Sequence, residues 1–223
     1  MNSDSFTKRP VEPNKEAFHA KMNKVIHILE KHGIELRKMN ALEVFGRAGD
    51  WHTIAYANKV KSLEVWEIDK RWEKELEKKL RTAKIKICDS INTVIEYDNP
   101  DKFDLIVIDN PMNTYGPKSE NGVSHYCEHF DIINHINKIM AGEGIVIFNV
   151  NRHPFDYEKS PLWKKRREEF YNVKNTDNMN VEFLLNFYKE LFRKIGFETV
   201  FHFYVVRHKH LDYFVYRLKS IIR

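Results

Sequence analysis

Short apolar runs alternate along the chain with amphipathic segments, and the two patterns predict different elements. Five runs rich in β-branched residues have the length of buried strands, at residues 42–45, 63–68, 85–88, 103–108 and 144–150. Apolar positions at helical spacing predict helices over residues 14–33, 51–60, 70–81, 125–140 and 180–195. Because strands and helices alternate, we expect a doubly wound α/β fold with a mostly parallel sheet and helices on both faces.

The end of the chain departs from this alternation. Residues 197–206 and 213–218 form two long β-rich segments, and only residues 207–212 separate them. This arrangement is typical of a β-hairpin, whose strands are antiparallel. We therefore expect the sheet to end in an antiparallel hairpin.

Polar or glycine-containing turns follow four successive predicted strands. The first turn is Gly46–Asp50, where glycine allows a ligand to approach the backbone closely. Glu67 follows the second strand, at a distance from the glycine turn that suits a carboxylate binding ribose hydroxyls. Asp89 and Asp109 follow the third and fourth strands. Ligands bind beyond the carboxyl ends of parallel strands, so this succession indicates a nucleoside-containing ligand.

With these four turns, the sequence resembles the class I S-adenosylmethionine-dependent methyltransferases. Residues 42–49, 65–69, 88–90 and 104–109 are similar to the first four motifs of that family, and the terminal hairpin is a further match. The resemblance implies a seven-stranded sheet of order 3-2-1-4-5-7-6 in a Rossmann-like domain over residues 38–223. An N-terminal helical segment would precede it at residues 1–37. It also implies S-adenosyl-L-methionine as the cofactor.

The resemblance implies a role for individual residues at the strand ends. Glu43 would organise the first turn or meet the cofactor's amino group, Glu67 would hold the ribose, and Asp89 would lie beside the adenine. The full expected cofactor-binding set is Glu43, Phe45, Gly46, Arg47, Gly49, Glu67, Ile68, Asp89, Ser90 and Asp109. Phe45 and Arg47 depart from the pattern, because the family has glycine at both positions.

Methyl transfer is an in-line displacement, so the protein mainly has to align the two reactants. A base is needed only for a protonated acceptor, and the candidates for the catalytic set are Asp109, Asn110 and His125. Two long connections, 110–131 and 151–178, follow strands on the cofactor side and are expected to be lids over the acceptor. The acceptor is unidentified, and a small molecule is slightly favoured over a nucleic acid.

Three other functions remain open. Asp109 followed by Tyr115-Gly116-Pro117 is also similar to the aminopropyltransferases, which use a decarboxylated relative of the same cofactor. A nicotinamide-dependent oxidoreductase has a related sheet, but a terminal antiparallel hairpin is not expected in that class of enzyme. The third alternative is a binding module without catalysis, because Phe45 and Arg47 replace glycines.

Composition limits the partners and the setting. Lys and Arg number 37 against 32 Asp and Glu, and the one basic cluster, residues 164–167, is the only candidate for contacts with nucleic-acid phosphates. The two cysteines and the polar start of the chain favour a cytoplasmic protein, and no apolar run is long enough for a membrane span. His125-x-x-Glu128-His129 has metal-ligand spacing, but we expect no metal because a third ligand is missing. The oligomeric state stays open.

Overall fold

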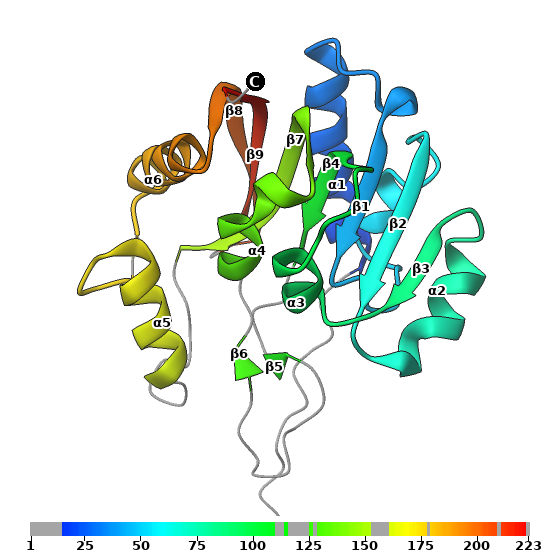
Figure 1. The fold of residues 1–223 in the computed structure, drawn as a ribbon, viewed down its shortest axis with the longest axis horizontal. Helices are drawn as coiled ribbons and strands as arrows, with labels where there is room; N and C mark the ends of the chain where they lie inside the picture. The colour runs from blue at the N-terminus through cyan, green and yellow to red at the C-terminus, as the bar shows by residue number, and fades with distance from the viewer. Residues whose placement is uncertain are drawn as a thin grey trace, which may run out of the picture.

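A seven-stranded sheet of order β3-β2-β1-β4-β7-β9-β8 organises the computed structural model (Figure 1). The structure describes residues 15–109, 114–115, 125–126, 129–152, 161–177, 179–208 and 211–221. The strands of this sheet are β1 (Asn40–Val44), β2 (Ser62–Glu67), β3 (Lys84–Ile87), β4 (Phe103–Ile108), β7 (Met140–Asn151), β8 (Phe197–His208) and β9 (Leu211–Ser220). The short strands β5 (Thr114–Tyr115) and β6 (His125–Tyr126) pair separately.

The predicted topology is confirmed. The first five strands of the large sheet pair in parallel, and β9 is antiparallel to both β7 and β8. Since β5 and β6 lie outside this sheet, β7, β8 and β9 are its fifth, sixth and seventh strands. The observed order is therefore the expected 3-2-1-4-5-7-6.

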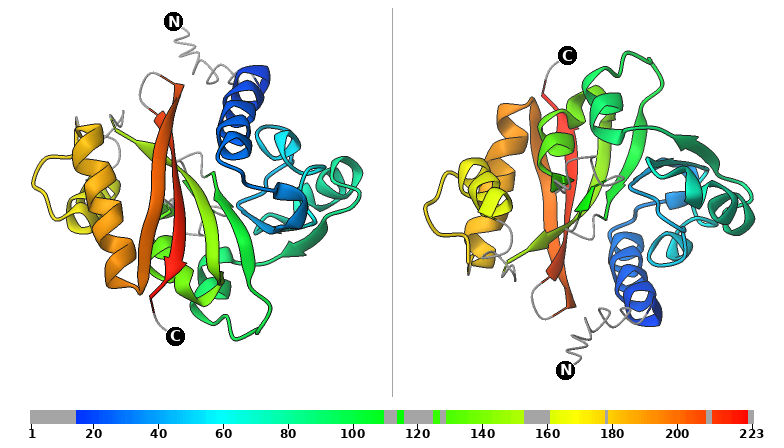
Figure 2. Two further views of the ribbon diagram at one scale, coloured as in Figure 1. Left: turned by 90° about the horizontal axis from the view of Figure 1, so that it is seen from above. Right: turned by 90° about the horizontal axis from the view of Figure 1, so that it is seen from below.

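Helices lie on both sides of the sheet (Figure 2). They are α1 (Lys15–Lys31), α2 (Glu73–Lys79), α3 (Ser90–Ile95), α4 (Phe130–Asn134), α5 (Pro161–Tyr171) and α6 (Val181–Lys194). Single 3-10 turns add η1 (Leu36–Lys38), η2 (Thr53–Ala55), η3 (Lys70–Trp72) and η4 (Ile136–Lys138). Among the helices that the structure describes, none is long and apolar enough to cross a membrane.

Side chains alternate between two cores along the central strands. In β4, Ile106 and Ile108 belong to the core that contains α6, whereas Leu105 and Val107 belong to the core that contains α1. Successive residues of a strand point to opposite faces, so a continuous apolar run serves both cores. The N-terminal helix α1 is therefore packed onto the sheet.

Two helix predictions are wrong. Residues 51–60 form only the short turn η2. The adjacent side chains of His52 and Thr53 are both buried, and their interior contacts favour a tight turn over a helix. The helix expected over 125–140 is reduced to α4 and η4, because its first residues pair with β5 and Met140 already belongs to β7. In both segments tertiary contacts outweigh the local helical pattern.

The carboxyl ends of the parallel strands meet at one edge of the sheet. The turn after β1 packs most tightly there, since a Cβ on Gly46 would lie 2.2 Å from Val65 Cγ1 and a Cβ on Gly49 2.8 Å from Leu80 Cδ1. These glycines let the turn lie against β2 and α2, whose side chains leave no space for a methyl group. The position of the whole turn therefore depends on them.

We expect Gly46→Ala to lower the free energy of unfolding by about 1–3 kcal/mol, because the added methyl group overlaps a buried side chain. Urea unfolding followed by circular dichroism measures the change. Gly142→Ala is the matched control, since a Cβ there has no atom within 4 Å. Equal unfolding midpoints for the two variants would contradict this packing role.

Candidate functional site

The turn after β1 alternates in backbone conformation. Phe45, Arg47 and Gly49 have positive φ angles of 70°, 45° and 62°. These are the three positions at which the methyltransferase family has glycine. A side chain in the left-handed region costs about 1–2 kcal/mol, so two of the three positions are strained. The turn keeps its conformation although glycine is present only at the last position.

Hydrogen bonds from the neighbouring strand hold this conformation. Glu67 Oε2 accepts from the backbone N–H of Arg47 at 2.5 Å, and Glu67 Oε1 accepts from that of Asp69 at 2.7 Å. The Gly46 N–H donates to Trp66 O at 2.9 Å. Burial raises the pKa of Glu67 more than these backbone donors lower it. Glu67 therefore anchors the turn, and its expected contact with a ribose stays a prediction.

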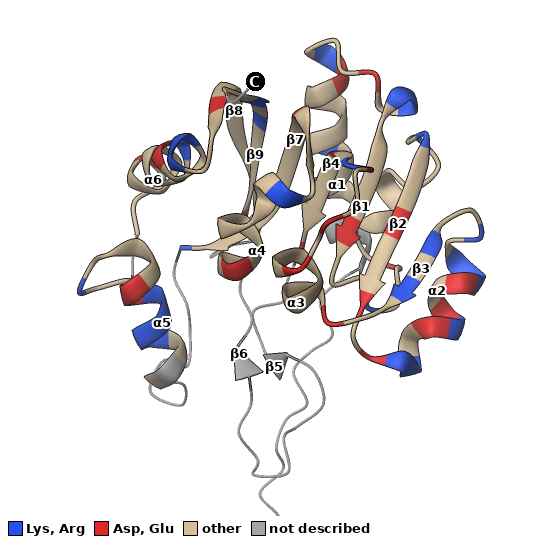
Figure 3. Cartoon of the chain, in the orientation of Figure 1, with Lys and Arg blue, Asp and Glu red and all other residues tan. Residues whose placement is uncertain are grey.

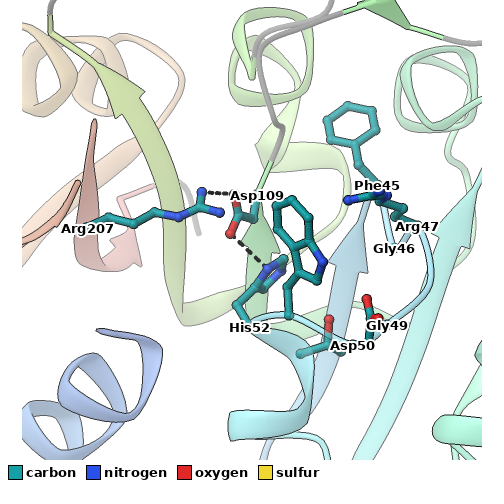
Figure 4. A pocket seen from close by; sticks show the side chains of 10 residues that line it. Phe45, Gly46, Arg47, Gly49, Asp50, His52, Asp109 and Arg207 are labelled. Atoms are coloured by element: carbon teal, nitrogen blue, oxygen red, sulfur yellow. Dashed lines mark hydrogen bonds and ion pairs between the residues drawn. The ribbon is translucent and has the colours of Figure 1, made fainter. Parts of the chain in front are cut away.

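A buried network of ionic groups lies beneath the turn (Figure 4). His52 bridges two carboxylates: its Nε2 contacts Glu43 Oε1, and its Nδ1 lies 2.8 Å from Asp109 Oδ2. Arg207 donates to Asp109 Oδ1, and the Tyr213 hydroxyl donates to Asp109 Oδ2 at 2.7 Å. All five side chains are buried. The network joins the turn to β1, β4, β8 and β9.

The network sets the charges of its members. Burial disfavours the charged form of His52, but the carboxylates of Asp109 and Glu43 outweigh it and raise the pKa of His52 to about 10. Burial also opposes ionisation of Asp109, yet Arg207 and His52 hold its pKa well below the usual range. Burial raises the pKa of Glu43. At neutral pH His52 is an imidazolium and Asp109 is a weakly basic carboxylate.

A pocket opens above this network, at the carboxyl ends of β1 and β4 (Figure 4). Its lining residues are Phe45, Gly46, Arg47, Gly49, Asp50, Trp51, His52, Thr53, Asp109 and Arg207. The cavity holds only about 30 Å³, because large side chains fill the space. The Arg47 guanidinium lies 4.6 Å from the centre of the Trp51 ring and 5.4 Å from that of Trp72.

The pocket contains part of the expected cofactor set. Phe45, Gly46, Arg47, Gly49 and Asp109 line it, and Glu43 touches it only through His52. The members outside its lining are Glu67, Ile68, Asp89 and Ser90. Asp89 instead caps α3 by accepting from the N–H groups of Ile91 and Asn92, and Ser90 is buried. Their contacts with a cofactor stay predictions.

Several residues of the site carry no sequence signal. His52, Arg207 and Tyr213 are absent from the expected set, because they meet Asp109 only after the sheet has formed. His52 has one local indication, its place directly after the glycine turn. Arg207 and Tyr213 lie about 100 residues after Asp109, and only the hairpin brings them to it.

The expected acceptor region is described only in part. Asn110 lies outside the described residues, as do most of the 110–131 connection and residues 153–160 of the other one. His125 is in β6, where only its backbone is described. His129 is buried against the Tyr188 hydroxyl, and burial lowers its pKa to about 3. The roles of Asn110 and His125 therefore stay predictions.

The basic cluster of residues 164–167 lies on α5, where the ribbon in Figure 3 is coloured blue for Lys and Arg. Arg166 pairs with Asp131, and Lys165 is 3.8 Å from Glu169. Arg167 is buried and donates to Asn151 O at 2.7 Å. Arg167 is thus unable to contact a phosphate at the surface, so fewer cations remain for the nucleic-acid contact that the sequence suggests.

The raised pKa of His52 makes stability depend on pH. A protonated histidine with a pKa of about 10 when folded stabilises the protein fully below about pH 6.5, its unfolded value. We expect His52→Gln to be destabilised most at about pH 6, and the gap to wild type to shrink as the pH rises toward 10. Urea unfolding across this range measures the difference in free energy of unfolding between variant and wild type.

His27→Gln is the control, because His27 is exposed on α1. A difference between His52→Gln and wild type that is constant with pH would contradict a charged His52.

No family model and no curated protein matches this sequence. Solved structures do match. Magnesium protoporphyrin IX methyltransferase from Synechocystis PCC 6803 with bound SAH has a TM-score of 0.57 at 11% identity, over 95% of this chain and 90% of that one. A putative sarcosine dimethylglycine methyltransferase from Galdieria sulphuraria has a TM-score of 0.56 at 10% identity, over 89% and 85%.

The N-methyltransferase NodS from Bradyrhizobium japonicum WM9 in complex with S-adenosyl-l-homocysteine is also similar. Its TM-score is 0.53 at 14% identity, over 90% of this chain and 87% of that one. Matches at this identity establish the architecture, and they agree with the strand order and the terminal hairpin. The chain therefore has the fold of the class I S-adenosylmethionine-dependent methyltransferases.

Proposed function

We propose that this protein is an S-adenosylmethionine-dependent methyltransferase that acts on a small-molecule acceptor. The backbone of the turn after β1 is the observation that supports it most. Positive φ angles at Phe45, Arg47 and Gly49 reproduce the pattern that the family's glycines permit, at a cost in strain that a plain connecting turn has no need to bear. Structural neighbours carrying the demethylated product support the same cofactor class.

The side chains of the pocket suit a ligand that joins an amino acid to a nucleoside. Arg47 and Asp50 supply opposite charges on the turn, and Glu67 and Asp89 lie at the next two strand ends. When bound, the cofactor supplies a methyl group activated by a sulfonium. Because the cavity holds about 30 Å³, side chains that line it have to rearrange on binding. A rearrangement of side chains alone is common when ligands bind.

Asp109 has a positioning role in this proposal. Its lowered pKa makes it a weak proton acceptor, since Arg207 and His52 both stabilise its ionised form. It instead fixes the end of β4 against the hairpin. In the proposal, the acceptor lies beside this strand end. Alignment of the reactants is the main requirement of an in-line transfer. Any proton acceptor is then sought in the 110–131 connection, where Asn110 and His125 remain the candidates.

A binding module without catalysis is the second candidate. The observation that favours it is that Asp109 is already paired with Arg207, His52 and Tyr213. Such a protein would bind the cofactor and leave its methyl group in place. The two candidates differ only in turnover, so a binding experiment has to be followed by a transfer experiment.

We expect isothermal titration calorimetry to detect binding of S-adenosylmethionine and S-adenosylhomocysteine, and none of NAD at the same concentration. Absence of binding of either nucleoside at millimolar concentration would refute the proposed function. Binding of NAD in their place would favour an oxidoreductase. Incubation with methyl-labelled cofactor and a small-molecule extract then tests catalysis, and label in a new compound supports a methyltransferase.

We expect Glu67→Gln to weaken S-adenosylhomocysteine binding about tenfold, because an amide group is unable to accept both backbone N–H bonds that hold the turn. Calorimetry measures the affinity. Glu64→Gln is the matched control on the same strand, since Glu64 pairs with the exposed Lys84. Equal affinities of the two variants would show that Glu67 is not needed to shape the site.

A further inference from the structure

The guanidinium of Arg47 lies in the wall of the pocket and has no counter-ion among the described residues. It lies over the Trp51 and Trp72 rings, and it makes no ion pair with any residue in the part of the chain that the structure describes. Glu67 accepts from the backbone N–H of Arg47 and does not pair with its side chain. Two aromatic faces thus hold a positive charge beside the cavity.

The carboxylates around Arg47 are already engaged. Asp69 pairs with Arg71, Asp50 lies 3.2 Å from Lys79, and Glu67 accepts from two backbone N–H groups. Asp109 is bound by Arg207 and His52. None of these described carboxylates pairs with the Arg47 guanidinium, and the planar fork of arginine matches a carboxylate with two parallel hydrogen bonds.

The backbone gives a second, independent reason to assign Arg47 a role. Its φ of 45° suits glycine, and arginine is strained there. The neighbouring Gly46 and Gly49 are explained by packing, because a Cβ on either would meet Val65 or Leu80. Position 47 instead carries a long cationic side chain, which lies over the Trp51 and Trp72 rings. Strain of this sort accumulates where a side chain serves a site.

We propose that Arg47 binds the α-carboxylate of the cofactor's methionine moiety, and that this loop thereby selects ligands that carry a carboxylate. This inference rests on the proposed function and adds a specificity determinant to it. It separates the chain from enzymes that use the decarboxylated cofactor, for which a guanidinium at this place has no partner. Arg47, one of the two residues that depart from the glycine pattern, then binds the charged end of the ligand.

The test compares two ligands that differ only by the carboxylate: S-adenosylhomocysteine and its decarboxylated analogue, S-adenosyl-3-thiopropylamine. Calorimetry gives the ratio of their affinities for wild type, for Arg47→Gly and for the control Arg71→Gln, an exposed cation on the next loop. We expect wild type and the control to prefer the carboxylate ligand at least about tenfold, and Arg47→Gly to lose this preference. Arg47→Gly suits the backbone, so it should unfold no earlier than wild type.

Each other outcome is decisive. If wild type binds both ligands equally, or if Arg47→Gly keeps the preference or weakens both ligands alike, the inference is wrong while the proposed function stands. If wild type prefers the decarboxylated ligand, the inference is wrong and the aminopropyltransferase alternative is favoured. If wild type binds neither ligand, both the proposed function and the inference fail.

Discussion

The pairing of Asp109 with His52 and Arg207 is the interaction on which the site depends. Asp109 directly follows β4, which lies in the middle of the sheet. Its partners come from the turn after β1 and from the terminal hairpin. A buried carboxylate is costly unless it is paired, so the two cations make this arrangement possible. The carboxylate also fixes the position of two distant segments, the turn with His52 about 60 residues away and the hairpin with Arg207 about 100 residues away. Asp109, His52 and Arg207 all line the pocket, so their pairing determines its shape.

The fold was predictable because the local pattern of apolar and polar residues determines most of its helices and strands. Apolar runs of strand length and amphipathic helices predict the parallel sheet, and the paired β-rich segments at the end predict the hairpin. The topology follows from the resemblance to a family and is confirmed by the strand pairing. The helix expected over 51–60 fails for a physical reason, since the interior contacts of His52 and Thr53 impose a tight turn in its place.

The candidate site was predictable only in part. The turn after β1 and Asp109 are visible because strand ends are the ordinary place for ligands. His52, Arg207 and Tyr213 are invisible because their importance arises from contacts made across the sheet. The anchoring role of Glu67 is also hidden, since a sequence shows a carboxylate at a strand end without showing which N–H groups it accepts. Long-range pairing therefore accounts for most of what the sequence does not reveal.

The left-handed residues of the turn after β1 bear on how such turns are recognised in proteins that share a fold but little sequence. A turn of this shape is usually identified by its glycines, yet Phe45 and Arg47 adopt the same angles because a neighbouring strand supplies the hydrogen bonds. The turn thus keeps its backbone conformation although two of its three usual glycines are replaced. Backbone angles therefore identify this turn where a glycine pattern does not, because two of its three left-handed positions carry side chains.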